Sequence, residues 1–457
     1  MKSNTIIRAV TAIFVLLCVF LQAGEAGAAT AGTIRAALVS GAESLSFKVS
    51  GNYEIVDLAT GKVLSELKQG ETCQVELKGS RIAVKGSRDS YGSFKGPVAV
   101  RESGSSAVVL NGSGAVKDLG LEKIMAISSD GKIVPLKLTV NPVIRTASGT
   151  IQFKGSSGGL NLVSLSSSSG SKRYRGSVEF CLEEGKLTAV NVLNIEDYLR
   201  GVVPSEMPSS WSSEALKAQA VAARNYALQR VETTRGSASN VNSDISSQVY
   251  GGYDAETVAT NKAVEETSGI IMLSGGSTVS AFFHSSSGGF TENSEDVWSG
   301  KLSYIRSKAD PYDKNEKHYN WKVSYTADQL KEKLAAAGYK FKKITDVVEL
   351  ERTSSGARVM ELAVKGVAPD GKSLTAEIKN ADNVRAALGL KSALFKFTKK
   401  YDRSKNLTEI NITGSGWGHG LGMSQYGAYG MALEGYDYQE ILKYYYWGIN
   451  FAQNYGR

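Results

Sequence analysis

Cysteine is scarce in this chain of 457 residues, and the three that occur exclude a disulfide-rich scaffold. Cys18 lies in the N-terminal apolar run without a small residue before it, which argues against a lipoprotein attachment site. Cys73 and Cys181 each lie in an apolar run typical of a strand. We expect two buried single thiols in different domains, although a disulfide between them in an oxidising compartment stays open.

Long hydrophobic runs are also lacking, apart from one at the N-terminus. Residues 9–21 are mostly apolar, but a membrane span needs about 20 such residues. Lys2 and Arg8 precede this run and residues 26–28 follow it with small side chains, a pattern typical of a secretory signal over residues 1–28. We expect a protein of the cell wall or the extracytoplasmic face of the membrane, with membrane contact only if this segment stays uncleaved.

Dense runs of lysine and arginine are absent although the formal net charge is +8, and no zinc-finger spacing occurs. Together with the export signal, these absences argue against nucleic acid as a partner. The nucleotide-phosphate pattern GxxxxGK[ST] is missing as well. The positive charge instead favours anionic cell-wall polymers, which carry phosphates and lactyl carboxylates.

Proline is rare, with seven in the chain, yet two of them flank one carboxylate. In residues 201–211 (GVVPSEMPSSW), Pro204 and Pro208 lie on either side of Glu206. Because proline fixes its own φ and restricts the residue before it, we expect a stiff loop. Its apolar residues would desolvate Glu206 and raise its pKa toward the range of a general acid. The alternative is a surface turn whose glutamate interacts with the following helix N-terminus.

Residues 212–230 predict a strong helix directly after this loop, with Glu214 in its first turn and Arg230 near its end. Apolar and small residues at helical spacing predict that it is buried, namely Leu216, Ala220, Ala223 and Ala227. Lys217 and Arg224 are seven residues apart and therefore lie nearly on one face. We expect this pair to bind an anionic or polyhydroxy ligand, the alternative being solvated charges on the helix flank.

Several long motifs follow one another from about residue 145 to the C-terminus. They are residues 190–211 (VNVLNIEDYLRGVVPSEMPSSW), 215–226 (ALKAQAVAARNY), 247–251 (SQVYG), 282–289 (FFHSSSGG) and 416–427 (GWGHGLGMSQYG). In this order they closely resemble the signature of the SpoIID/LytB family, which comprises stage II sporulation protein D and amidase-enhancer proteins. The resemblance implies binding and cleavage of peptidoglycan glycan strands. In sporulation members it implies lytic transglycosylation of strands already stripped of their stem peptides.

Under this resemblance Glu206 protonates the glycosidic oxygen and then takes the proton of the muramoyl 6-hydroxyl, which attacks C1 and leaves a 1,6-anhydro end. One acid/base suffices, whereas a hydrolase uses two carboxylates. Glu196 or Asp197 offers a second carboxylate, but we expect both on a helical turn before the site. The side chains expected to contact substrate are Lys217, Arg224, Gln248, His284, Ser286, Trp417, His419, Gln425 and Tyr426.

Two of the three histidines fall in the glycine-containing motifs. We expect His284 at the end of a strand, and His419 in the glycine-rich residues 414–422 ahead of a helix that begins near Met423, where backbone N–H groups can face an oxygen-rich ligand. Ligand contact is expected for both histidines, the alternative being imidazoles satisfied by loop backbone.

Some relatives in this family hold zinc with a cysteine where this chain has Ser287. Neither Cys73 nor Cys181 is near His284 in sequence, so we expect no metal, and we expect no cofactor. The loop of residues 284–289 (HSSSGG), called the serine loop below, is then expected to be held by hydrogen bonds that involve Glu292, Asn293 and Trp298. Two other functions stay open: a non-catalytic glycan-binding enhancer of a cell-wall amidase, and a structural protein of the sporulation envelope.

The expected fold class is α+β, with a mixed helical and β core, an inserted small α+β subdomain and an N-terminal β-rich module. Residues 29–143 show short alternating strands with turn signals, as in residues 54–64 and 128–134, and predict an accessory wall-binding or spacer domain. Residues 144–457 then form the SpoIID/LytB domain. Residues 326–400 are the expected insertion, with Leu330, Leu334 and Leu388 in its core.

Two smaller elements are predicted between the first helix and the insertion. Asp254 is expected to cap a helix that continues through Thr267, with Gly269 ending it. Residues 269–283 are expected to form a β-hairpin about a turn at residues 275–276 (GG).

Overall fold

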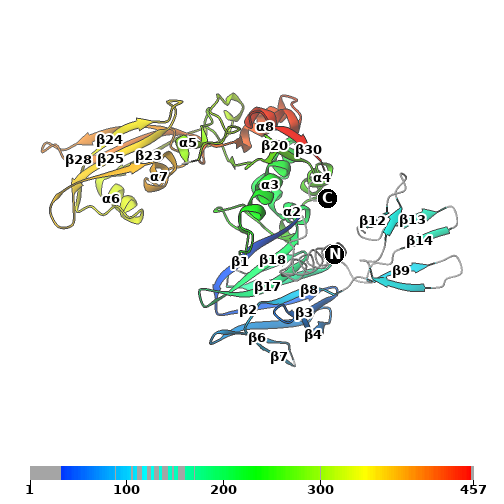
Figure 1. The fold of residues 1–457 in the computed structure, drawn as a ribbon. Coiled ribbons are helices and arrows are strands. Elements are labelled where there is room, and N and C mark those ends of the chain that lie inside the picture. The colour runs from blue at the N-terminus through cyan, green and yellow to red at the C-terminus, as the bar shows by residue number, and fades with distance from the viewer. Residues whose placement is uncertain are drawn as a thin grey trace, which may run out of the picture.

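The computed structural model describes residues 32–453 except for residues 88, 104–105, 111–115, 121–124, 128–132, 136–142, 147–148, 153–159, 169 and 299. Figure 1 shows a β-sandwich, a helical region beside it and a small α+β unit that projects from the helices. This arrangement confirms the expected α+β class. The expected signal at residues 1–28 lies outside the described residues.

The sandwich stacks a seven-stranded sheet on a six-stranded sheet. The first has the order β19-β1-β18-β17-β8-β3-β4 and consists of β1 (Thr33–Ala42), β3 (Tyr53–Asp57), β4 (Lys62–Leu67), β8 (Val98–Glu102), β17 (Ser177–Glu183), β18 (Lys186–Asn194) and β19 (Val241–Asn242). The second has the order β16-β15-β2-β5-β6-β7 and consists of β2 (Ser44–Ser50), β5 (Thr72–Lys78), β6 (Arg81–Lys85), β7 (Ser90–Phe94), β15 (Leu162–Ser167) and β16 (Gly170–Tyr174). Phe47 stacks on Phe180 from the opposite sheet, so the inner faces share one core.

Strands from both sides of the boundary expected at residue 143 share these sheets. β2 pairs with β15, and β1 pairs with β18. Between β8 and β15 lie three two-stranded ladders, made by β9 (Ser106–Leu110), β10 (Val116–Gly120), β11 (Met125–Ile127), β12 (Ile133–Pro135), β13 (Val143–Thr146) and β14 (Gly149–Gln152). Most of the turn expected at residues 128–134 lies outside the described residues.

The two described cysteines are buried free thiols, as expected. The expectation that they belong to different domains is wrong. Cys73 lies in β5 and Cys181 in β17, which belong to the two facing sheets of one sandwich. Local apolar runs identify strands but carry no information about which sheets stack together.

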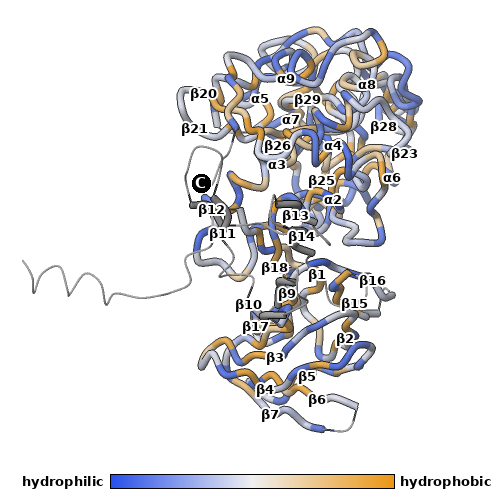
Figure 2. The backbone as a smooth tube through the Cα atoms, turned by 90° about the vertical axis from the view of Figure 1, so that its right-hand side faces the viewer, coloured by the Kyte–Doolittle hydropathy of each residue, from blue (hydrophilic) through white to orange (hydrophobic). Residues whose placement is uncertain are grey.

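The helical region is built around α3 (Ser213–Thr233). It lies at the opposite end of the molecule from β3, β4 and β7 (Figure 2). Its other elements are α2 (Ile195–Glu206), η2 (Tyr253–Ala255), α4 (Val258–Glu266), α5 (Ser294–Val297), η3 (Pro311–Asp313), α8 (Gln425–Leu433) and α9 (Tyr438–Tyr445). The predicted burial of α3 is confirmed, because its four stripe residues are at most 2% exposed. Small side chains allow the neighbouring helices to approach α3 closely.

One predicted helix start is wrong by a few residues. Asp254 does not cap α4, because its carboxylate accepts hydrogen bonds from the backbone and side chain of Arg173. Thr257 caps α4 instead. The helix expected near Met423 is confirmed: α8 begins at Gln425, directly after β29 (Met423–Ser424), which pairs in parallel with β22 (Phe283–His284).

The predicted hairpin is confirmed. β20 (Ile271–Ser274) and β21 (Ser277–Thr278) pair across Gly275 and Gly276, whose positive φ angles of 58° and 82° are those that a tight hairpin turn requires. β20 also pairs with β30 (Asn450–Ala452). His284 lies at the end of β22, as expected.

The inserted unit has a hydrophobic core of its own. It comprises β23 (Asn320–Thr326), α6 (Ala327–Ala336), β24 (Lys343–Arg352), β25 (Val359–Val367), β26 (Ser373–Lys379), α7 (Ala381–Ala387), β27 (Phe395–Tyr401) and β28 (Leu407–Ser415). Leu330, Leu334 and Leu388 are fully buried there, as expected. The core extends from Trp321 to Ile412, past both ends of residues 326–400, and β23 enters beside the strand by which the chain leaves.

Candidate functional site

Glu206 is the last residue of α2, and the expectation of a stiff loop around it is wrong. Pro204 lies inside the helix, where it gives up one backbone hydrogen bond while the apolar face of α2 stays packed. Met207 is extended (φ −128°, ψ 140°), as the residue before a proline usually is, so Pro208 ends the helix. The carboxylate therefore stands at the end of a rigid element.

Neutral donors hold the half-buried Glu206 side chain. Oε1 accepts the backbone N–H of Val249 at 2.9 Å, and Oε2 accepts the side-chain amide of Gln425 at 3.2 Å. Burial raises the pKa of Glu206, and these two hydrogen bonds lower it, with a net upward shift. The predicted direction of the shift is confirmed. The C-terminal end of a helix dipole also disfavours a negative charge at this position.

The two glutamines beside Glu206 come from α8 and α3. Gln425 donates a second hydrogen bond through the same Nε2, to Oε1 of Gln219 at 3.3 Å. Gln219 is completely buried. Its own Nε2 has no hydrogen-bond partner among the described residues.

Aromatic side chains line the same end of α8. Trp211 stacks on Tyr429 with a centroid distance of 4.6 Å and meets Tyr426 edge to face at 4.8 Å. All three are partly exposed, and Tyr426 directly follows Gln425. Partly exposed aromatic rings are suited to packing against sugar rings.

Three predicted contact residues are engaged within the protein. Arg224 is fully buried, and its Nε and Nη2 each lie 2.7 Å from a carboxylate oxygen of Glu196. Gln248 is also buried; it accepts from Tyr198 and donates to a backbone carbonyl. Lys217 forms two ion pairs, with Glu214 and Glu266, both at 2.8 Å. In the 247–251 motif it is the backbone of Val249 that reaches Glu206.

The serine loop is held by a residue that the sequence did not single out, Asp313. One of its oxygens accepts hydrogen bonds from the hydroxyls of Ser286 and Ser287 and from the N–H of Gly288. Asp310, also buried, has a pKa raised to about 7 by burial and then by the nearby charge of Asp313.

Arg358 of the inserted unit supports the same loop from the other side. Its guanidinium is fully buried, donates to the carbonyls of Ser287 and Phe290 at 2.8 Å, and pairs with Glu292 at 3.3 Å. Of the residues expected to hold the loop, Glu292 acts through this pair, while Asn293 donates to Asp296 and Ser354.

The two motif histidines lie beside each other, with ring centroids 5.4 Å apart. His284 is buried, its Nδ1 faces the carbonyl of Leu421, and its Nε2 has no partner among the described residues. Nδ1 of His419 accepts the N–H of Leu421, and its ring packs on Trp298. Burial lowers the pKa of both, that of His419 to about 4, so both are neutral near pH 7. Each imidazole thus contacts the backbone of Leu421, and ligand contact by the two histidines stays a prediction.

The side chain of Trp417 is exposed, and glycines lie on both sides of it in the sequence. Its backbone exchanges two hydrogen bonds with Ser286, at 3.0 and 2.9 Å. Gly418 has a φ of 117°, and a Cβ there would lie 2.7 Å from Cβ of His284. The indole is 43% exposed, with the ammonium of Lys391 5.1 Å from its ring centroid and the His318 ring at 4.7 Å. This aromatic and cationic surface is suited to a sugar that carries a carboxylate.

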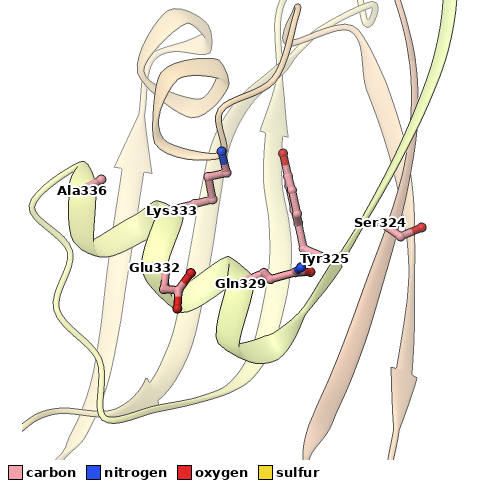
Figure 3. Close-up of a pocket in the computed structure, with 6 residues that line it drawn as sticks. All are labelled: Ser324, Tyr325, Gln329, Glu332, Lys333 and Ala336. Atoms are coloured by element: carbon pink, nitrogen blue, oxygen red, sulfur yellow. The ribbon is translucent and has the colours of Figure 1, made fainter.

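A pocket of about 410 Å³ opens on the inserted unit. Figure 3 shows Lys333 of α6 extending alongside the ring of Tyr325, with a distance of 5.9 Å from Nζ to the ring centroid. None of the residues described around Glu206 lines this pocket.

Among the described residues, no group of three His, Cys, Asp or Glu side chains is arranged to hold a metal ion. Within the same part of the chain, no helix is long and apolar enough to cross a membrane.

Two family patterns match the part of the chain that contains the candidate site. The sequence pattern of the family described as Stage II sporulation protein matches residues 183–273, and that of a domain of unknown function matches residues 292–422. The first match contains Glu206 and the second contains Trp417. The chain is 34% identical over 289 residues to the amidase enhancer of Bacillus subtilis (strain 168), covering 55% of this chain and only 39% of that protein's length.

Two relatives are covered over more of their length. Stage II sporulation protein D of Bacillus subtilis (strain 168) is 32% identical over 280 residues, which is 58% of this chain and 76% of that protein. An uncharacterised protein of Brachyspira hyodysenteriae is 35% identical over 284 residues, which is 61% of this chain and 72% of that protein. On this similarity the chain belongs to the stage II sporulation protein D family, as its motifs indicated.

Proposed function

We propose that this protein is a peptidoglycan lytic transglycosylase. The observation that carries the proposal is the setting of Glu206, a carboxylate at a helix end that accepts hydrogen bonds from two neutral donors and whose pKa is raised by burial. A general acid needs a pKa close to the working pH.

The reaction uses one carboxyl group twice. Protonated Glu206 gives its proton to the glycosidic oxygen while the bond from that oxygen to C1 of the muramoyl residue breaks. The 6-hydroxyl oxygen of the same sugar then bonds to C1, and its proton passes to ionised Glu206. The products are a 1,6-anhydro-muramoyl end and a strand with a free 4-hydroxyl, and the acid is restored. Gln425 and the N–H of Val249 stabilise the ionised form between the two transfers.

The carboxylates at the start of α2 are poorly placed for hydrolysis. Asp197 and Glu196 lie nine and ten residues before Glu206, which is about 14 to 15 Å along the helix axis. Paired glycosidase carboxylates lie at most about 9.5 Å apart. Transglycosylation, which needs no second carboxylate, is therefore favoured over hydrolysis by this pair.

Two surfaces are proposed to bind the strand. The first is the ring pair of Tyr426 and Trp211, since Tyr426 directly follows Gln425, the residue that donates to Glu206. Trp417, with Lys391 and His318, offers a cationic aromatic surface for a sugar bearing a lactyl carboxylate. Six further side chains already have partners within the protein, and their contact with substrate stays a prediction. They are Lys217, Arg224, Gln248, His284, Ser286 and His419.

The second candidate is a non-catalytic, glycan-binding enhancer of a cell-wall amidase. It is favoured by the 34% identity to the Bacillus subtilis amidase enhancer. In this case Glu206 recognises a sugar hydroxyl without transferring a proton. Either function places the protein outside the cytoplasmic membrane, on glycan strands that are stripped of stem peptides if an amidase acts first.

The test is mass spectrometry of purified glycan strands, stripped or bearing peptides, after incubation with the protein lacking residues 1–28 and with its Glu206→Gln variant. Anhydro-muramoyl ends formed only by the unaltered protein are expected. Reducing ends would point to hydrolysis. Binding without any cleavage would replace the proposal with the enhancer, and the preferred strand tells whether an amidase must act first.

A further inference from the structure

The amide of Gln425 is oriented by the residue behind it. Gln425 is 8% exposed, and its Nε2 lies within hydrogen-bond distance of two acceptors, Oε2 of Glu206 and Oε1 of Gln219. An ionised carboxylate can only accept, so Gln425 must present its NH₂ group to it. The oxygen of Gln219 favours that same orientation from the opposite side.

Gln219 accepts this hydrogen bond with its oxygen while its own NH₂ group stays without a partner among the described residues. The residue is completely buried. A buried N–H without a partner is unusual and calls for an explanation. If the Gln219 amide turned over, its NH₂ would face the NH₂ of Gln425, two donors in contact. The arrangement therefore leaves the NH₂ group of Gln219 unpaired among the described residues and keeps the NH₂ group of Gln425 pointed at Glu206.

We propose that Gln219 is a positioning residue, which fixes Gln425 as a hydrogen-bond donor to Glu206 and thereby sets the protonation equilibrium of the acid. The inference rests on the proposed function, since it concerns the acid of that reaction. Without Gln219 the Gln425 amide is free to turn over and present its oxygen to a protonated Glu206. The ionised form of Glu206 then loses a donor and the protonated form gains an acceptor.

The protonation of Glu206 is governed by burial and by neutral hydrogen-bond donors and not by ion pairs. Burial and the bonds from Val249 and Gln425 account for the pKa of Glu206, without a contribution from a charged side chain. Two cations of α3 are already paired, Arg224 with Glu196 and Lys217 with Glu214 and with Glu266 of α4. The third, Arg230 in the last turn, donates to the carbonyl of Asn240. Among titratable groups, the buried phenol of Tyr198 in α2 interacts with the charge of Glu206. The phenols of Tyr250 and Tyr426 directly follow the two donors to Glu206, and Glu316 acts on Tyr426.

The test is the pH profile of anhydro-muramoyl end formation on stripped glycan strands by Gln219→Met, which keeps the side-chain volume and removes the amide. The alkaline limb, where Glu206 loses its proton, is expected to move upward by about 0.3 to 1 pH unit, as the loss of one hydrogen bond allows. The rate at the acid plateau and KM are expected to change little. Gln229→Met, the same change further along α3, is the matched control and leaves the profile in place.

A purely structural role would lower the rate at every pH without moving the limb, and that result overturns the inference. Gln425→Met is expected to move the limb the same way, and the double variant no further than Gln425→Met alone, because Gln219 acts through Gln425. Additive shifts would also overturn it. If Gln219→Met does not fold, Gln219→Asn, whose oxygen no longer reaches Gln425, takes its place. Anhydro ends formed by Glu206→Gln would instead refute the proposed function.

Discussion

Helix α2 carries a carboxylate at each end, and the two are held in opposite ways. In the first turn, Glu196 faces the fully buried guanidinium of Arg224 with two hydrogen bonds of 2.7 Å. At the last residue, Glu206 accepts only from neutral groups, a backbone N–H and the Gln425 amide. The charge of Glu196 is needed because a cation is buried against it. Among the residues that the structure describes, no cation pairs with Glu206, so its charge is free to change during a reaction.

The comparison is broken most directly by Glu206→Gln. We expect the formation of anhydro-muramoyl ends to fall by a factor of about 100 to 10,000, the range typical of a lost general acid. The variant is still expected to fold, because the amide keeps the shape of the side chain and removes a buried charge, although its NH₂ group costs one of the two hydrogen bonds that Glu206 accepts. Product analysis and thermal unfolding check both halves. An active variant, or an unfolded one, would contradict the contrast between the two ends of α2.

Glu196→Gln tests the opposite end. It leaves the buried guanidinium of Arg224 without a counter-charge, and we expect the free energy of unfolding to fall by about 3 kcal/mol. Chemical denaturation measures this loss. Glu214→Gln, which weakens the partly exposed pair with Lys217, is the control and is expected to cost less than about 1 kcal/mol. Equal losses in the two variants would show that burial of Arg224 does not govern the effect.

Asp310 extends the comparison to another buried carboxylate, one that forms no ion pair among the described residues, although Lys308 is near enough to feel its charge. Its pKa of about 7 lies above the usual 3.8, so the folded protein holds this proton more tightly than the unfolded chain. The resulting stabilisation is complete below about pH 4 and is lost as the pH rises through about 7. We expect the melting temperature of Asp310→Asn to depend less on pH over this window. Asp370→Asn, at an exposed position, should keep the dependence of the unaltered protein; identical curves for all three proteins would contradict the prediction.

The smallest effect is expected for Lys217→Met. Lys217 is partly exposed and shares its charge between Glu214 and Glu266, so the loss in stability should stay within about 1 kcal/mol. Glycan cleavage should change by less than about twofold, because the ammonium is already engaged. A large increase in KM at constant kcat would instead show that Lys217 leaves its partners to bind substrate, as the sequence pattern predicted.

Local patterns predicted the parts of this molecule that depend on near neighbours. The buried stripe of α3, the hairpin about Gly275 and Gly276 and the leucine core of the insertion each follow from spacing within about one element. The path of α2 through Pro204 did not, because packing of its apolar face outweighs the proline.

The supporting shell of the candidate site left little local signal. Gln425 meets Glu206 across 219 positions of sequence, and Arg358 meets Ser287 across 71. Asp313 holds the serine loop from 25 to 27 positions away. Such buried polar pairs depend on the folded topology, which a single sequence does not reveal. The sequence therefore singled out Glu206 and Gln425, but it predicted neither the contact between them nor the residues behind the motifs, which are Gln219, Asp313 and Arg358.

Arg358 also limits how this protein can change over evolution. It belongs to the inserted unit, yet its head group lies against Gly420 and is enclosed by the serine loop. Although β23 and β28 would allow the unit to be cut out at adjacent ends, deletion would remove this arginine and strand Glu292 in the interior. Descendants that lose the unit must replace both residues together, so its presence or absence should covary with the residue at position 292.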